Sequence, residues 1–187
     1  PTIFFEFHGT ETGAKEQAET VQAIAEEFGG SAFQWTSKME DRNKLWQARH
    51  DAYYAAIALR SGCQGWATDV CVPVSRLAEC INETKDDLEE TGLISPLVGH
   101  VGDGNFHMLY IVDPNNQEEM AKAQAHSDRM VMRALEMGGT CTGEHGVGYG
   151  KIHFLTNEHG DAMSLMRSLK TAFDPDNIMN PGKIVNI

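Results

Sequence analysis

Apolar residues recur along the chain with two periodicities, one typical of helices and one typical of strands. Spacings of three and four residues predict four helices, over residues 12–28, 39–60, 76–90 and 117–137. Runs of β-branched and aromatic residues predict five strands, over residues 2–8, 32–35, 66–74, 96–100 and 106–112. Ser75 is the expected N-cap of the third helix. The predicted order is therefore β-α-β-α-β-α-β-β-α.

This order predicts an α+β fold, in which an antiparallel sheet carries helices packed on one face. Residues 96–100 and 106–112 flank a Gly-Asp-Gly-Asn turn and are expected to form a hairpin. The alternation of strands and helices also allows an internal duplication of a ferredoxin-like unit, although the sequence shows no clear repeat.

Length and composition limit the class of protein. The chain has 187 residues and 41% hydrophobic residues, enough for one domain with its own core. No apolar run approaches the ~20 residues that cross a bilayer, so we do not expect an integral membrane protein. The 27 acidic residues outnumber the 15 basic ones, and the formal charge of −12 argues against a nucleic acid partner. The chain begins within a strand-like pattern, without an initiator methionine, and we expect a piece of a longer protein.

The four cysteines lack the paired Cys-x-x-Cys spacing of zinc ribbons and redox pairs. Buried free thiols are the better interpretation, and they favour a reducing compartment. These cysteines are Cys63, Cys71, Cys80 and Cys141.

The predicted hairpin holds the first cluster of candidate chemistry. Residues 97–107 read Leu-Val-Gly-His-Val-Gly-Asp-Gly-Asn-Phe-His, and histidines such as His100 and His107 are good ligands for divalent metals. The glycines around His100 indicate a close approach of the main chain to something bound. Taken alone, a hairpin turn with two structural histidines explains this cluster equally well.

A second cluster, Cys-Thr-Gly-Glu-His-Gly-Val-Gly over residues 141–148, favours the metal site. Glu144 would complete a His-His-Glu set that suits zinc, manganese or iron, and the spacing does not choose among them. His145 would then lie beside the metal as a candidate general base, with a supporting or surface histidine as the alternative. Gly143 and Gly146 allow the kinked backbone that adjacent residues need to serve one site.

Arg49 lies on the largely apolar stripe of the helix predicted over residues 39–60. A buried guanidinium needs an anionic partner, because its desolvation is otherwise costly. An internal carboxylate and a substrate carboxylate explain this position equally well.

Three stretches resemble the C-terminal substrate domain of FAD-linked 2-hydroxy acid dehydrogenases in the vanillyl-alcohol oxidase superfamily. They are Gly-His-Val-Gly-Asp-Gly-Asn-Phe-His, Gly-Glu-His-Gly and the closing Asn180-Pro-Gly-Lys. The stretches Leu45-Trp46-Gln-Ala-Arg49-His50 and Thr68-Asp69-Val-Cys71-Val-Pro73 most resemble the branch that oxidises D-lactate and passes electrons to cytochrome. The resemblance covers nearly the whole chain.

The resemblance implies roles for the same residues. His100, His107 and Glu144 would hold the divalent metal, His145 would be the catalytic base, and Arg49 would bind the substrate carboxylate. Asn180 is expected to contact FAD. Most of the contacts with FAD are expected from an N-terminal domain that is missing from this chain. The isolated chain is therefore expected to be inactive.

The resemblance also narrows the substrate to a small 2-hydroxy acid. The branch that oxidises D-2-hydroxyglutarate has polar residues where this chain has Ala67 and Leu109, and a second carboxylate would stay unpaired against them. We therefore expect oxidation of D-lactate to pyruvate, with D-2-hydroxyglutarate and glycolate as alternatives. Cytochrome c or a quinone would accept the electrons, in mitochondria, in the bacterial cytoplasm or at the periphery of the bacterial inner membrane. A non-catalytic metal-binding or interaction module is the alternative from another class.

Overall fold

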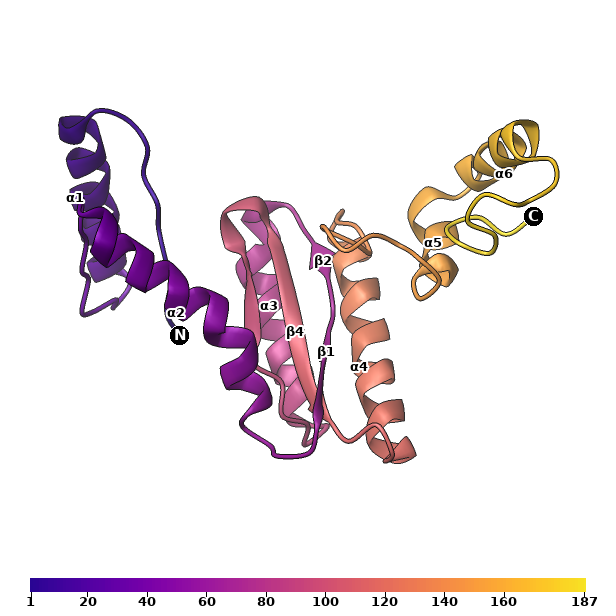
Figure 1. Cartoon of the computed structure of the whole chain (residues 1–187), viewed down its shortest axis with the longest axis horizontal. Coiled ribbons are helices and arrows are strands. Elements are labelled where there is room, and N and C mark those ends of the chain that lie inside the picture. The colour runs from indigo at the N-terminus through magenta and orange to yellow at the C-terminus, as the bar shows by residue number, and fades with distance from the viewer. The chain divides into compact units, whose positions relative to one another are not determined.

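The computed structural model describes residues 1–187, which divide into two compact units, residues 1–53 and residues 54–187. Helix α1 (Glu11–Glu27) and most of helix α2 (Met39–Ile57) belong to the first unit, and all the strands belong to the second (Figure 1). Thr10 caps α1, because its Oγ1 accepts a hydrogen bond of 3.2 Å from the backbone N–H of Gly13. Both predicted helices are confirmed, although α2 ends at Ile57 and Leu45 and Tyr53 of its predicted apolar stripe are exposed.

The strands predicted over residues 2–8 and 32–35 are wrong, since neither segment is extended in a sheet. A strand needs a neighbouring strand for its backbone hydrogen bonds, and the first unit contains none. Phe4 of the first segment instead contacts α2, where its ring stacks on the ring of Trp46 with the centroids 6.5 Å apart. Ala18 is the one buried residue of this unit.

The second unit contains a four-stranded antiparallel sheet in which every strand pairs with β4 (Asn105–Val112). β3 (Leu97–His100) lies on one side of β4, and β1 (Gln64–Ala67) and β2 (Val70–Cys71) follow each other along the other side. β3 and β4 are joined by a 3-10 turn over Val101–Asp103. The predicted hairpin is thus confirmed.

β1 and β2 are two parts of the strand predicted over residues 66–74, separated at Thr68 and Asp69. The register is the same on both sides of this interruption, because Ala67 pairs with Leu109 and Val70 pairs with Phe106. Asp69 therefore falls opposite His107, and this relationship positions the candidate site.

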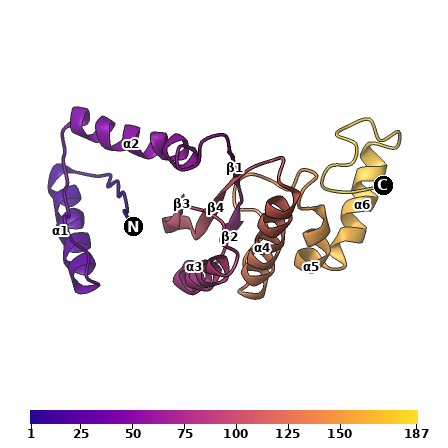
Figure 2. The same ribbon diagram turned by 90° about the horizontal axis from the view of Figure 1, so that it is seen from below.

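Helices α3 (Val74–Glu89) and α4 (Gln117–Glu136) cover one face of the sheet (Figure 2). The even-numbered side chains of β4 point to these helices, and its odd-numbered side chains point to the other face. The main core accordingly joins Phe106, Met108, Tyr110 and Val112 to buried residues of both helices. The predicted α+β fold, with helices on one face of an antiparallel sheet, is confirmed, and the single sheet shows no duplicated unit.

α3 begins one residue before Ser75, and its N-cap is Pro73, which makes no side-chain capping bond. The predicted Ser75 cap is therefore wrong, because the extended backbone of Pro73 already sets the start of the helix. Two further helices, α5 (Leu155–His159) and α6 (Ala162–Phe173), were not predicted, since Gly160 interrupts the periodicity between them with a φ of 52°. None of the helices combines the length and the apolar character that crossing a membrane requires.

Candidate metal and active site

His107 lies on β4, on the sheet face opposite α3 and α4, and is 5% exposed. Its Nδ1 lies 2.7 Å from the carbonyl oxygen of Thr68. Because a carbonyl oxygen can only accept, Nδ1 carries a proton and donates this hydrogen bond. This assignment leaves Nε2 as the nitrogen with a free lone pair.

Nε2 of His107 lies 2.9 Å from Oε1 of Glu144. A lone pair and a carboxylate oxygen at this distance repel each other unless a proton or a metal cation lies between them. Two donors that each lie about 2.1 Å from a divalent cation are about 3.0 Å apart at the right angle of an octahedral shell and about 3.4 Å apart at the tetrahedral angle of a zinc site. The two atoms therefore fit a shared divalent metal.

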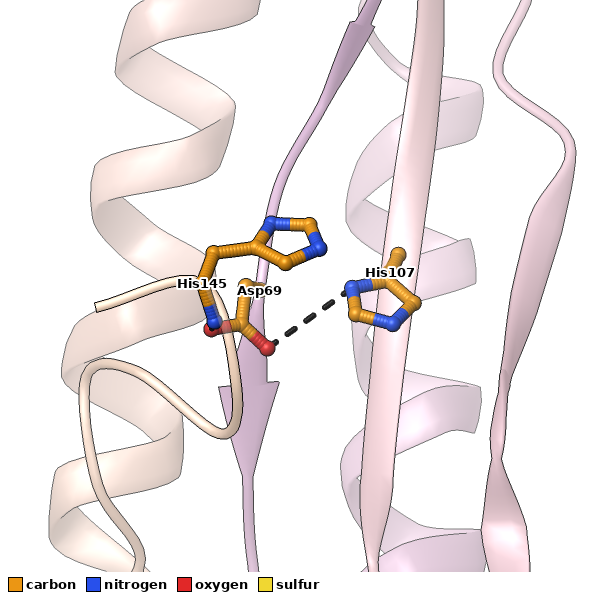
Figure 3. A group of neighbouring side chains, drawn as sticks. All are labelled: Asp69, His107 and His145. Atoms are coloured by element: carbon orange, nitrogen blue, oxygen red, sulfur yellow. Dashed lines mark hydrogen bonds and ion pairs between the residues drawn. The ribbon is translucent and has the colours of Figure 1, made fainter. Parts of the chain in front are cut away.

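The ring of His145 stacks on the ring of His107, with centroids 4.8 Å apart and planes 9° from parallel (Figure 3). Its Nε2 lies 3.8 Å from Oε1 of Glu144, and neither ring nitrogen forms a hydrogen bond within the chain. The side chain is 46% exposed. His145 therefore keeps a free nitrogen within reach of the space beside Glu144.

Asp69 is the residue of this site that the sequence analysis did not select. It is 1% exposed, and its Oδ1 lies 3.7 Å from Nδ1 of His107 (Figure 3). One donor atom from each of Asp69, His107 and His145 lies within 4.8 Å of the others. An acidic residue inside a predicted apolar strand is a signal for such a site, because a buried carboxylate needs donors or a cation.

Both carboxylate oxygens of Asp69 already accept hydrogen bonds from the chain. Burial by itself raises the pKa of Asp69, but these hydrogen bonds outweigh it and hold the pKa below its ordinary value. The donors are Asn105 Nδ2 at 2.7 Å to Oδ1, and Thr142 Oγ1 at 2.8 Å, Glu144 N at 3.0 Å and His145 N at 2.9 Å to Oδ2. Asp69 is therefore ionised and fixed by protein donors.

His100 lies at the end of β3, is exposed, and does not belong to the group of neighbouring donor atoms. His100 pairs with Asn105 across the sheet, and His107 pairs with Val98. His100 and His107 therefore point to the same face of the sheet as diagonal neighbours on adjacent strands. The structure thus brings His107, Glu144 and His145 together and leaves His100 outside. The role of His100 as a third metal ligand stays a prediction.

Leu109 is 1% exposed and packs with Ala56 and Ile111 in a small cluster on the same sheet face as His107. Ala67, its partner across the sheet, is exposed. The two positions expected to select the substrate are therefore direct neighbours in the sheet, two residues along β4 from His107.

Arg49 belongs to the first unit, and Asn180 makes none of the contacts described above. Arg49 is a partly buried residue of α2, and it makes no ion pair with another residue of the first unit. An internal carboxylate partner for Arg49 is thus not present there. Asn180 is exposed, with a φ of 49°, and its carbonyl accepts a hydrogen bond of 3.3 Å from the N–H of Lys183. The expected contact of Asn180 with FAD stays a prediction.

Comparison with known proteins agrees with the motifs around these residues. Residues 1–184 match the family described as FAD linked oxidases, C-terminal domain. The chain is 50% identical to a probable mitochondrial D-lactate dehydrogenase of Danio rerio and 44% identical to a mitochondrial D-lactate dehydrogenase [cytochrome] of Arabidopsis thaliana. It is 31% identical to the glycolate oxidase subunit GlcD of Bacillus subtilis.

These matches cover nearly all of this chain but a smaller part of its relatives. The matches with the Danio, Arabidopsis and Bacillus proteins cover 100%, 99% and 97% of this chain. In the same order, they cover 38%, 33% and 38% of those proteins. The chain therefore spans between a third and two fifths of the length of these relatives.

Proposed function

We propose that this chain, which belongs to the family of C-terminal domains of FAD-linked oxidases, is the substrate- and metal-binding domain of a flavin-dependent D-2-hydroxy acid dehydrogenase. The observation that carries the proposal is the contact of 2.9 Å between His107 Nε2 and Glu144 Oε1, with the free imidazole of His145 beside it. This arrangement brings donors for a cation together with a base, and both can assist removal of the proton from a substrate hydroxyl group.

D-lactate is the proposed substrate and pyruvate the product. The names of the relatives at 50% and 44% identity support this choice. The apolar Leu109 supports it as well, because a second carboxylate of D-2-hydroxyglutarate would find no polar partner at this position. Glycolate is the second candidate, since a relative at 31% identity is named a glycolate oxidase subunit.

His107 and Glu144 would hold zinc, manganese or iron, with His100 as the further ligand that the family resemblance implies. Such a cation supplies positive charge that stabilises the developing negative charge on the substrate hydroxyl oxygen. His145 takes the hydroxyl proton at a ring nitrogen, and Arg49 binds the substrate carboxylate. FAD, when bound, is the acceptor for the hydride of carbon 2, so loss of one proton and one hydride converts the alcohol to a ketone.

The proposal includes a partner domain and an electron acceptor. Because the chain spans 38% of the Danio relative, we infer that an FAD-binding domain of the same polypeptide completes the enzyme. Cytochrome c or a quinone would reoxidise the flavin. Mitochondria are the proposed location by similarity to relatives named as mitochondrial, and the bacterial glycolate oxidase subunits keep the bacterial alternative open.

A substrate panel on the full-length flavoprotein tests this function. D-lactate, glycolate, D-2-hydroxyglutarate and L-lactate are compared by dye reduction at equal concentrations. We expect the highest kcat/KM for D-lactate and no turnover of L-lactate. Preference for glycolate would establish the second candidate, and no turnover of any 2-hydroxy acid would contradict the proposal.

A further inference from the structure

The interruption between β1 and β2 directs backbone carbonyl groups toward the candidate site. The carbonyl oxygen of Thr68 lies 2.7 Å from Nδ1 of His107, and the carbonyl oxygen of Asp69 accepts a hydrogen bond of 2.6 Å from Nζ of Lys151. Strand pairing resumes in the same register at Val70. The interruption therefore frees these two carbonyl groups for side chains, while the N–H of Thr68 still donates to Met108 and the register of the sheet does not shift.

The carboxylate of Asp69 lies in a concavity formed by the loop that carries Glu144 and His145. The backbone N–H groups of these two residues and the hydroxyl of Thr142 all donate to the same oxygen, Oδ2. Successive backbone N–H groups that converge in this way form a binding site for an anion. Here the anion is a side chain of the sheet.

Gly143 allows the loop to approach this closely. A Cβ atom added at Gly143 would lie 2.0 Å from Nδ2 of Asn105 and 3.0 Å from Oδ1 of Asp69. Only glycine therefore fits between the loop and the sheet, so the Gly-Glu-His-Gly sequence is shaped for contact with Asp69.

The hydrogen bonds and the nearby charge of Asp69 indicate a role in holding the loop. Oδ2 accepts three hydrogen bonds, and Oδ1 accepts one from Asn105. Lys151 adds a positive charge, with Nζ 3.6 Å from Oδ2. Three donors from one loop on a single carboxylate oxygen are well suited to hold that loop in place.

We propose that Asp69 is the positioning residue that fixes the backbone of Glu144 and His145 relative to His107. This inference deepens the proposed function and rests on it. The carboxylate holds the loop at two consecutive residues, so it sets the place of the proposed metal ligand and of the proposed base together. Asp69 acts through these residues and does not touch the substrate.

The variant Asp69→Asn in the full-length flavoprotein tests the proposal, with Thr142→Val as a second variant that removes one donor and keeps the carboxylate. Hydrogen exchange of the backbone N–H groups of Glu144 and His145 is followed by mass spectrometry, and kcat and KM are measured with D-lactate. We expect faster exchange in both variants. In Asp69→Asn, kcat should fall about 10- to 100-fold, the range for loss of a group that orients a metal ligand, with a smaller change in KM.

Two controls separate this inference from a general loss of stability and from failure of the proposed function. Tyr110→Phe removes a buried hydrogen bond to His126 on the other face of β4, and it should lower stability without faster exchange at residues 144 and 145. Glu144→Ala keeps the backbone N–H, so it should retain slow exchange while it loses metal. Metal retained by Glu144→Ala contradicts the proposed metal site and leaves the role of Asp69 standing.

Unchanged exchange and unchanged kcat in both Asp69→Asn and Thr142→Val overturn the inference. The inference is also overturned if Tyr110→Phe lowers kcat as much as Asp69→Asn does, because the fall in kcat would then follow the loss of stability alone. If Asp69→Asn does not fold, hydrogen exchange of the wild type decides, because fast exchange of the N–H groups of Glu144 and His145 would show that Asp69 does not hold them.

Discussion

The hydrogen bond between Nδ1 of His107 and the carbonyl oxygen of Thr68, at 2.7 Å, determines which ring nitrogen faces Glu144. It leaves the lone pair of Nε2 directed at a carboxylate oxygen 2.9 Å away. The sheet thus orients one histidine as a ligand through a backbone group, while Oγ1 of Thr68 accepts the hydrogen bond of the Met108 N–H at 2.9 Å.

Replacing His107 by alanine should remove one metal ligand. Loss of a group that only supports a metal ligand lowers metal affinity about 10- to 100-fold. Because His107 would be a ligand itself, we expect a larger fall in the metal affinity of the full-length protein. Metal per flavin after dialysis, measured by mass spectrometry, checks this result. His159→Ala, on α5, is the matched histidine control and should retain the metal. Full occupancy in His107→Ala would rule out His107 as a ligand.

Replacing Leu109 by alanine should lower the free energy of unfolding by about 2–5 kcal/mol, because the change leaves a cavity in a packed site. Leu109 is 1% exposed and contacts Ala56 and Ile111. Denaturant unfolding measures the loss, and KM for D-lactate is measured beside it. A changed KM with unchanged stability would instead show that Leu109 contacts substrate and contributes little to packing.

The stability of the fold should depend on acid pH through Asp69. Its folded-state pKa is lowered, since hydrogen bonds to the carboxylate outweigh the effect of burial. The stabilisation is therefore complete above the unfolded pKa of about 3.9 and is lost as pH falls further toward the folded value. Urea midpoints between pH 6 and pH 3 should show the stability difference between wild type and Asp69→Asn shrinking at the acid end. A constant difference would contradict an ionised Asp69.

The buried thiols should react slowly. All four cysteines are free thiols, but the predicted burial holds only for Cys80 and Cys141, because Cys63 and Cys71 are partly exposed. Burial, together with the carboxylate of Glu158, raises the pKa of Cys141 to about 12, and burial raises the pKa of Cys80. Iodoacetamide at pH 8 should therefore modify Cys63 first, as peptide mapping would show. Early modification of Cys141 would indicate that its surroundings open in solution.

Local sequence patterns predicted helices α3 and α4 and the hairpin of the second unit, because these elements depend on spacing within short segments. They failed for residues 2–8 and 32–35, where aromatic and β-branched residues suggested strands. Whether an apolar segment joins a sheet depends on a partner strand elsewhere in the chain, and local sequence does not contain that information.

Local sequence also predicted only part of the candidate site. Motif chemistry selected His107, Glu144 and His145, which the structure brings together, and it did not select Asp69. The importance of Asp69 comes from backbone groups of residues far along the chain, such as the N–H of His145, and backbone groups leave no signature in a sequence. The buried acidic position in the strand was the one available signal.

The most direct test of the account compares Glu144→Ala and His145→Ala in the full-length flavoprotein, with metal content and kcat for D-lactate measured on the same preparations. We predict that Glu144→Ala loses the metal, and that His145→Ala keeps it while kcat falls about 10²- to 10⁴-fold, the scale for a lost general base. Metal retained in Glu144→Ala, or full turnover in His145→Ala, would contradict the assignment of ligand and base.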